Sequence, residues 1–162
     1  MKKTILPLLV FLVWSCGEEK RLYLSTESHP ALDSCILAND FTIICYIDSS
    51  NCSVCAMQWL IGWSARADEL KNMNTNIMLI ARNSDEEAVH DALEQLHLTF
   101  PLTFDPFYTI KQNNAIIMNQ HAVFAVNKEK EVVWLGLPIA NEKTWNLFCK
   151  TIRQLLKSKK QK

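Results

Sequence analysis

The sequence has little glycine, little proline and no excess of charge of either sign. Three glycines and five prolines in 162 residues are few for the many tight turns of an all-β sandwich. Lysine and arginine total 17, as do aspartate and glutamate, so no whole-chain electrostatic attraction favours nucleic acid as a partner. Hydrophobic residues make up 49% of the chain, which disfavours disorder and suffices for one domain with its own core. Six cysteines are too few for a small disulfide-built scaffold, but they raise the question of redox chemistry.

An apolar run long enough to cross a bilayer is also lacking. The longest run, within residues 5–14, is only about ten residues, against the roughly 20 that a spanning helix needs. Lys2 and Lys3 precede it, and small residues follow it at 15–17. A positive start, a short apolar segment and small residues beyond it predict a secretory signal peptide over residues 1–15.

Residues 13–16 (Val-Trp-Ser-Cys) are similar to a bacterial lipobox, whose cysteine is lipidated and becomes the first residue of the mature chain. We therefore expect Cys16 to anchor the protein to a membrane without a spanning helix. Plain secretion and a retained core helix are the alternatives, and Pro7 and the charged residues 18–21 disfavour the helix. The expected location is the bacterial cell envelope, at the outer membrane facing the periplasm, with surface display left open. Thiols exported there can be oxidised.

The rest of the chain divides into three parts. Residues 16–39 are mixed in character and predict the lipid anchor, a tether and a short lead-in. Residues 40–158 carry the apolar patterns of one folded domain. Residues 159–162 form a basic tail, and the lysines from position 157 onward suit the negative end of a helix dipole.

Residues 40–158 predict alternating strands and helices. Strands are expected at 41–47, 76–81, 100–104, 121–126 and 131–135, and helices at 52–71, 84–96 and after Asn141, with a turn or small helix at 105–114. The apolar stripe of the first helix comprises Ala56, Leu60, Trp63, Ala67 and Leu70. Strands that enclose a helix pair in parallel, whereas a short polar connection at 127–130 predicts an antiparallel hairpin. The expected fold class is therefore α/β, a mixed sheet covered by helices on both faces.

The sequence Cys52-Ser-Val-Cys55 lies where the first predicted strand gives way to a helix. Unpaired backbone N–H groups and the dipole at a helix start favour a thiolate at Cys52. Cys55 lies one turn further on, so the two sulfurs are within bonding reach. The pair predicts an outer thiolate that attacks a substrate disulfide and an inner thiol that resolves the mixed disulfide.

This arrangement resembles the thioredoxin fold, in particular exported TlpA-like and peroxiredoxin-like lipoproteins, over about residues 41–157. The segment FTIICYIDSSNCSVC is similar to the active-site strand and turn, LTFPLTFDPFYTI to the strand and short helix after the extra βα unit, and HAVFAVNKEKEVVWLG to the closing hairpin. The resemblance implies a thioredoxin-like, membrane-anchored thiol–disulfide oxidoreductase with Cys52 and Cys55 as catalytic residues. It implies protein thiols and disulfides of the cell envelope as partners, and neither a cofactor nor a metal.

Four positions depart from the family pattern. His121 stands where the family has a proline facing the dithiol, while Asn51, Val54 and Tyr46 replace an aromatic residue, a proline and a buried acid. Three interpretations of His121 stay open. It fills a loop as a partly buried residue, it faces Cys52 and stabilises the thiolate or shuttles a proton, or it completes a zinc or copper site with the two cysteines.

The other cysteines, histidines and tryptophans predict structural roles. Cys45 and Cys149 fall on buried positions as small core residues, and Cys35 in the lead-in is a candidate to pair with one of them. Three histidines lack ligand spacing and are expected at the surface: His29, His90 and His97. Four tryptophans are expected in the core: Trp59, Trp63, Trp134 and Trp145.

Two other functions remain as alternatives. The missing family features favour a non-catalytic, thioredoxin-like binding or accessory lipoprotein in which Cys52 and Cys55 form a structural disulfide. Ser49, three residues before Cys52, faintly resembles a peroxidatic motif. However, the proline of that motif would fall at Cys45, and the sequence does not place Arg82 near Cys52.

Overall fold

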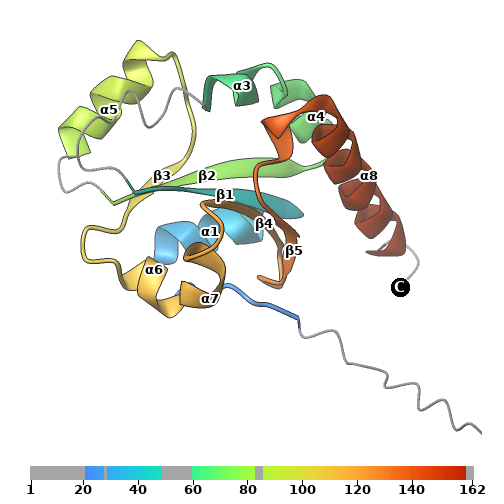
Figure 1. Ribbon diagram of the computed structural model, residues 1–162, viewed down its shortest axis with the longest axis horizontal. Helices are drawn as coiled ribbons and strands as arrows, with labels where there is room; N and C mark the ends of the chain where they lie inside the picture. The colour runs from blue at the N-terminus through green and yellow to red at the C-terminus, as the bar shows by residue number, and fades with distance from the viewer. Residues whose placement is uncertain (1–20, 28, 49–59, 83–85, 160–162) are drawn as a thin grey trace, which may run out of the picture.

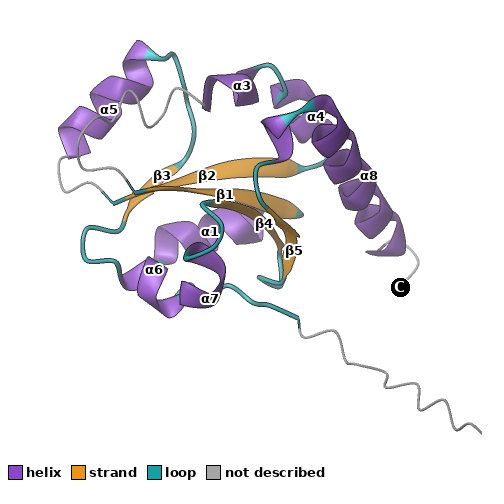
Figure 2. Ribbon diagram, viewed as in Figure 1, coloured by secondary structure: helices purple, strands orange, loops and turns teal. Residues whose placement is uncertain are grey.

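The computed structural model describes residues 21–27, 29–48, 60–82 and 86–159, and the structural statements below concern these residues. A central β-sheet lies between two layers of helices (Figure 1). Figure 2 shows the same arrangement by element type, with the strands gathered in the middle layer. The expected α/β fold with helices on both faces is therefore confirmed.

The sheet has five strands in the order β3-β2-β1-β4-β5. They are β1 (Phe41–Ile47), β2 (Thr75–Ala81), β3 (Leu102–Phe104), β4 (Val123–Asn127) and β5 (Val132–Leu135). Strand β2 pairs in parallel with β1 and β3, whereas β4 pairs antiparallel with β1 and β5. All seven residues of β1 are buried, as expected of an apolar central strand that is covered on both sides. The predicted mixed sheet and hairpin are confirmed.

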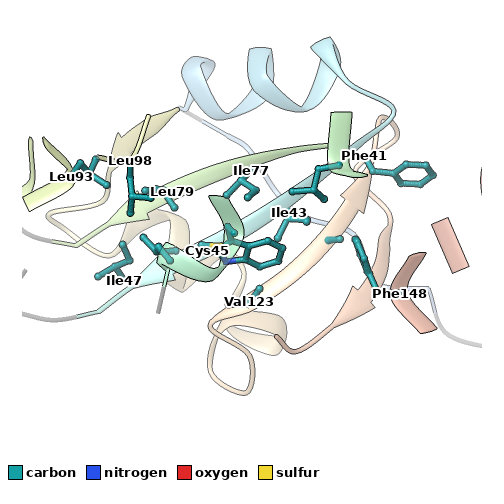
Figure 3. Close-up of a cluster of buried hydrophobic side chains, with 14 of the residues drawn as sticks. Phe41, Ile43, Cys45, Ile47, Ile77, Leu79, Leu93, Leu98, Val123 and Phe148 are labelled. Carbon is teal, nitrogen blue, oxygen red and sulfur yellow. The ribbon is translucent and has the colours of Figure 1, made fainter. Parts of the chain in front are cut away.

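Alternating residues of β1 contribute to two hydrophobic cores on opposite faces of the sheet. Phe41, Ile43, Cys45 and Ile47 belong to the first core (Figure 3). Its helices are α3 (Ile61–Ser64), α4 (Ala67–Asn72), α5 (Glu86–Gln95) and α8 (Glu142–Lys159). Ile44 and Tyr46 belong to the second core, whose helices are α1 (Pro30–Ala38), α6 (Thr109–Asn113) and α7 (Ala115–Met118).

The prediction of one continuous helix to residue 71 is wrong for the described residues. They form two short helices, α3 and α4. The backbone N–H of Arg66 donates to the carbonyl of Trp63 at 2.9 Å, and Arg66 has φ −109° and ψ 2°, which are not helical. Its guanidinium binds Glu69 and Glu142 and lies 5.1 Å from the ring centroid of Trp145. These tertiary contacts favour a break that local apolar spacing does not predict. Trp63, Leu60 and Leu70 are buried as expected, but Ala67 is exposed.

The segment predicted as a lead-in contains helix α1, which packs on the sheet through Leu32 and Ile36, both fully buried. Before it, residues 22–24 run beside β5. The N–H of Val132 donates to the carbonyl of Leu22 at 2.8 Å, and Tyr23 forms an antiparallel bridge with Glu131. The folded part of the chain therefore includes residues well before position 40.

Helix α8 begins as the sequence predicts. The side-chain Oδ1 of Asn141 accepts the N–H of Thr144 at 2.9 Å, which caps the helix. A short 3₁₀ turn, η2 (Pro138–Ala140), connects β5 to this cap. In the part of the chain described here, no helix combines the length and the apolar character needed to cross a membrane.

Candidate functional site

The candidate site lies at the edge of the sheet where the parallel strands end. The proposed catalytic pair, Cys52 and Cys55, and the proposed lipidation site, Cys16, fall outside the described residues. Strand β1 leads into this segment at Asp48, and the described chain resumes at Leu60, which is fully buried. The geometry of the cysteine pair therefore stays a prediction, and the site is built here from the residues around it.

Asp48, directly after β1, is held by two cations from neighbouring elements. Its Oδ1 lies 3.2 Å from Nη1 of Arg82, and its Oδ2 lies 2.6 Å from Nζ of Lys111. The backbone N–H of Arg82 also donates to the carbonyl of Ile47 at 3.0 Å. All three side chains are about one-quarter to one-third exposed, so the ion pairs position Asp48 more than they stabilise the fold. Arg82, which the sequence could not place, is thus bound to the last described residue before the segment that contains Cys52.

Tyr108 extends this cluster from the loop between β3 and α6. The guanidinium carbon of Arg82 lies 4.0 Å from the centroid of its ring. Tyr108 has φ 58°, a left-handed conformation that is uncommon for an aromatic residue and costs on the order of 1–3 kcal/mol. Its carbonyl accepts the N–H of Gln112 at 2.8 Å, which holds the strained residue at the start of α6. The left-handed turn at Tyr108 therefore places its ring under the guanidinium of Arg82.

Asp105, directly after β3, carries a fully buried carboxylate that accepts three hydrogen bonds. It accepts hydrogen bonds from the hydroxyl of Tyr46 at 3.1 Å and from the N–H groups of Ile110 at 3.1 Å and Lys111 at 3.0 Å. Burial, together with the Asp105 charge, raises the pKa of Tyr46 well above its usual range, so Tyr46 stays a donor. The sequence predicts a turn at Asp105 but not this role, because the hydrogen-bond partner Tyr46 is distant in sequence.

His121 lies just before β4 and is partly exposed. Its N–H donates to the carbonyl of Ile117 at 3.0 Å, and the next residue, Ala122, accepts the N–H of Tyr46 at 2.7 Å. These contacts bring the backbone at 121–122 beside the end of β1. The relation of His121 to the cysteine pair remains a prediction. Within the described ranges, no cluster of three or more histidine, cysteine or acidic side chains could hold a metal ion.

The cysteines of the described chain are all free thiols. Cys45 and Cys149 are buried, as predicted for core residues, and burial raises the pKa of both. Cys35 is half-buried and accepts a weak hydrogen bond from Nδ2 of Asn76 at 3.8 Å, while burial raises its pKa as well. The alternative that Cys35 pairs with Cys45 or Cys149 is wrong.

Among the described residues, the expectations for histidine and tryptophan hold except at His29. His90 and His97 are exposed, whereas His29, the residue before α1, is partly buried and its Nε2 has no hydrogen-bond partner among the described residues. Trp63 and Trp145 are buried in the first core and Trp134 packs against it. Trp59 falls outside the described residues.

No protein family matches the chain by sequence, and neither does any curated protein. Several solved structures match its fold. The peroxidoxin BcpB of Mycobacterium tuberculosis has a TM-score of 0.57 at 12% identity, covering 75% of this chain and 83% of the other. The thioredoxin domain of thiol-disulfide oxidoreductase BVU-2223 from Bacteroides vulgatus has a TM-score of 0.55 at 15% identity, covering 72% and 81%.

A third structure, described as a thiol:disulfide interchange protein DsbE from Chlorobium tepidum, has a TM-score of 0.52 at 13% identity and covers 75% of this chain and 84% of the other. At these identities the likeness shows the fold and leaves the activity to the chemistry of the site. Strand order, pairing and the helices on both faces agree with it. The chain therefore has the thioredoxin-like fold.

Proposed function

We propose that the protein is a membrane-anchored thiol–disulfide oxidoreductase that uses Cys52 and Cys55. One observation carries the proposal: in chain order, the Cys-x-x-Cys sequence falls between β1 and α3 of a thioredoxin-like fold, and Asp48, which Arg82 binds, lies directly after β1. The similar folds of a thiol-disulfide oxidoreductase and a peroxidoxin support a redox role.

The proposed reaction is a two-electron exchange between dithiol and disulfide. The thiolate of Cys52 attacks one sulfur of a protein disulfide, a mixed disulfide forms, and the other substrate sulfur leaves as a thiolate. Cys55, deprotonated, then attacks Sγ of Cys52, forms the intramolecular disulfide and releases the second substrate thiolate. The substrate is reduced and the pair is oxidised, so a dithiol partner must reduce it again. The reverse sequence oxidises a substrate dithiol.

The proposed setting is the bacterial cell envelope. Lipidation of Cys16 would hold the protein at the outer membrane facing the periplasm, and exported proteins with thiols or disulfides would be its substrates. The variant Cys16→Ala should release the protein from the membrane fraction. A Cys16→Ala protein that stays in the membrane fraction would contradict the anchor.

The test of the chemistry uses single-cysteine variants and a model protein disulfide. Cys52→Ala should abolish reduction, whereas Cys55→Ala should still attack and accumulate mixed disulfides. Cys149→Ala is the matched control, since this thiol is buried and lies in α8, so it should retain activity. Full activity in Cys52→Ala would refute the mechanism.

A second candidate, a non-catalytic binding lipoprotein, is favoured by one observation: His121 replaces the proline that the family has before this hairpin. A glutathione redox titration separates the two. A reversible couple between about −120 and −270 mV supports an oxidoreductase, whereas a pair still oxidised below about −300 mV supports a structural disulfide.

A further inference from the structure

Phe107 is exposed to solvent on a turn that the rest of the fold holds in place. Its side chain is 81% exposed, the largest value among the large apolar side chains of the described residues. It lies in a β-turn in which the N–H of Tyr108 donates to the carbonyl of Asp105 at 3.2 Å. Aspartate at the first position and Pro106 at the second are typical of such turns, and proline fixes φ there. The chain therefore presents Phe107 to solvent in a defined conformation.

Both ends of this turn are fixed by contacts with other elements. The buried carboxylate of Asp105 accepts three hydrogen bonds, one of them from the hydroxyl of Tyr46 on β1. Tyr108 has the left-handed φ of 58°, and the guanidinium carbon of Arg82 lies 4.0 Å from its ring centroid. A turn that is already ordered loses little conformational entropy when Phe107 contacts another molecule. An aromatic side chain is suited to such a contact, because it offers a large apolar surface with few rotatable bonds.

The turn lies at the edge of the sheet where β1 leads into the segment that contains Cys52. Strands β1, β2 and β3 are parallel, so the loops that follow them meet at one edge (Figure 1). Asp48, directly after β1, binds Arg82 at 3.2 Å, and Arg82 contacts the residue next to Phe107. Cys52 is four positions after Asp48, and a fully extended chain of that length spans at most about 14 Å. An extended substrate chain rises about 3.3 Å per residue, so a segment of several residues can reach from Cys52 to Phe107.

We propose that Phe107 binds the substrate polypeptide beside its disulfide and selects substrates that carry apolar side chains there. The inference rests on the proposed redox chemistry of Cys52 and Cys55, and it specifies the substrate class. Proteins whose disulfide is flanked by apolar residues would be favoured over those with polar flanks and over small disulfides such as oxidised glutathione. Burial of an aromatic ring against an apolar side chain strengthens binding about tenfold or more.

The test measures the rate constants with which three disulfides oxidise the reduced full-length protein, followed by thiol alkylation and mass spectrometry. Two are peptides of equal length and charge, each with one intramolecular disulfide, that differ only in leucine or serine beside the cysteines. The third is oxidised glutathione. The wild type should react about tenfold faster with the leucine peptide than with the serine peptide.

Substitutions at Phe107 should change this preference and nothing else. Phe107→Ser should lower the rate constant for the leucine peptide about tenfold and leave those for the serine peptide and for glutathione unchanged. Phe107→Leu keeps an apolar side chain and should retain most of the preference. Ile116→Ser is the matched control, since Ile116 is 71% exposed but belongs to α7, and it should leave all three rate constants unchanged.

The outcomes separate this inference from the proposed function. Equal rate constants of wild type and Phe107→Ser for the leucine peptide overturn the role of Phe107, and a wild type that does not distinguish the two peptides overturns the apolar selectivity. In both cases reduction of the peptides leaves the oxidoreductase standing. A wild type that reacts with none of the three disulfides overturns the proposed function, and the role of Phe107 loses its premise with it.

Discussion

The hydroxyl of Tyr46 donates a hydrogen bond of 3.1 Å to the carboxylate of Asp105 inside the second core, across 59 positions of sequence. This bond links β1 to the loop after β3. It therefore holds the ends of these two strands in place at the edge where the candidate site lies. The same carboxylate accepts two N–H groups at the start of α6. One buried group therefore organises the strand end and the helix that carries Lys111.

Removing the Tyr46 hydroxyl should destabilise the fold without changing its shape. In Tyr46→Phe, the buried carboxylate of Asp105 loses one donor, and we expect a loss of about 1–3 kcal/mol in the free energy of unfolding. Urea denaturation measures it. Tyr23→Phe, at a tyrosine that is 55% exposed, should change the stability by less than about 0.5 kcal/mol. Equal stability of Tyr46→Phe and the wild type would show that the bond contributes nothing.

Asp33 makes stability depend on pH. Hydrogen bonds from Lys130 and Thr26 hold the pKa of Asp33 below its usual range. Because the folded pKa is lowered, this contribution is complete above the unfolded value of about 3.9 and is lost as pH falls through the folded value. Asp33→Asn should therefore lose most stability relative to wild type near neutral pH, and this deficit should shrink as the pH falls below about 3.9. Asp91→Asn, at an exposed position, is the control. A deficit that stays constant with pH would contradict the assignment.

The free thiols should react in the order of their exposure. In a variant with Cys52→Ser and Cys55→Ser, a thiol reagent should label Cys35 first, because Cys35 is half-buried while Cys45 and Cys149 are buried. A raised pKa keeps all three slow compared with an exposed cysteine. Adding Cys35→Ser should remove the fastest phase. Labelling of Cys45 before Cys35 would show that the first core opens locally.

Asp48 should tune the proposed nucleophile with little effect on the fold. Asp48→Asn leaves the charges of Arg82 and Lys111 without their shared carboxylate, so we expect the pKa of Cys52, read from the pH dependence of alkylation, to fall. Stability should change by less than about 1 kcal/mol, since these pairs are partly exposed. Asp40→Asn, at the other end of β1, removes an equivalent charge and should leave alkylation of Cys52 unchanged. Equal alkylation profiles of Asp48→Asn and wild type would refute the coupling.

The sequence predicted those elements whose buried residues follow a regular spacing or a capping residue within the element itself. The β-branched run of β1 and the spacing of three and four in α5 were sufficient, and Asn141 marked the start of α8. Helix α1 was missed because its apolar residues do not form one stripe: Ile36 is fully buried while its neighbour Leu37 is 54% exposed.

The contacts of the candidate site were harder to predict because they depend on strand order. Tyr46 meets Asp105, and Asp48 meets Lys111, only when β3 lies on the far side of β2 from β1. The break at Arg66 depends in the same way on Glu142, 76 positions away. Position in the sequence identifies His121 and Arg82 as candidates, but only the assembled sheet shows that Arg82 binds Asp48.

The N-terminal segment along β5 also limits how the sheet can meet another chain. An edge strand with free N–H and C=O groups invites pairing with a second molecule, which leads to aggregation or domain swapping. The carbonyl of Leu22 accepts the N–H of Val132 on β5, the N–H of Leu24 donates to the carbonyl of Lys130 just before this strand, and the other edge, β3, is only three residues long. A truncated form that begins at residue 40 would lack Leu24, Leu32 and Ile36, so it would expose both β5 and the remaining residues of the second core. It would therefore self-associate more readily than the longer chain.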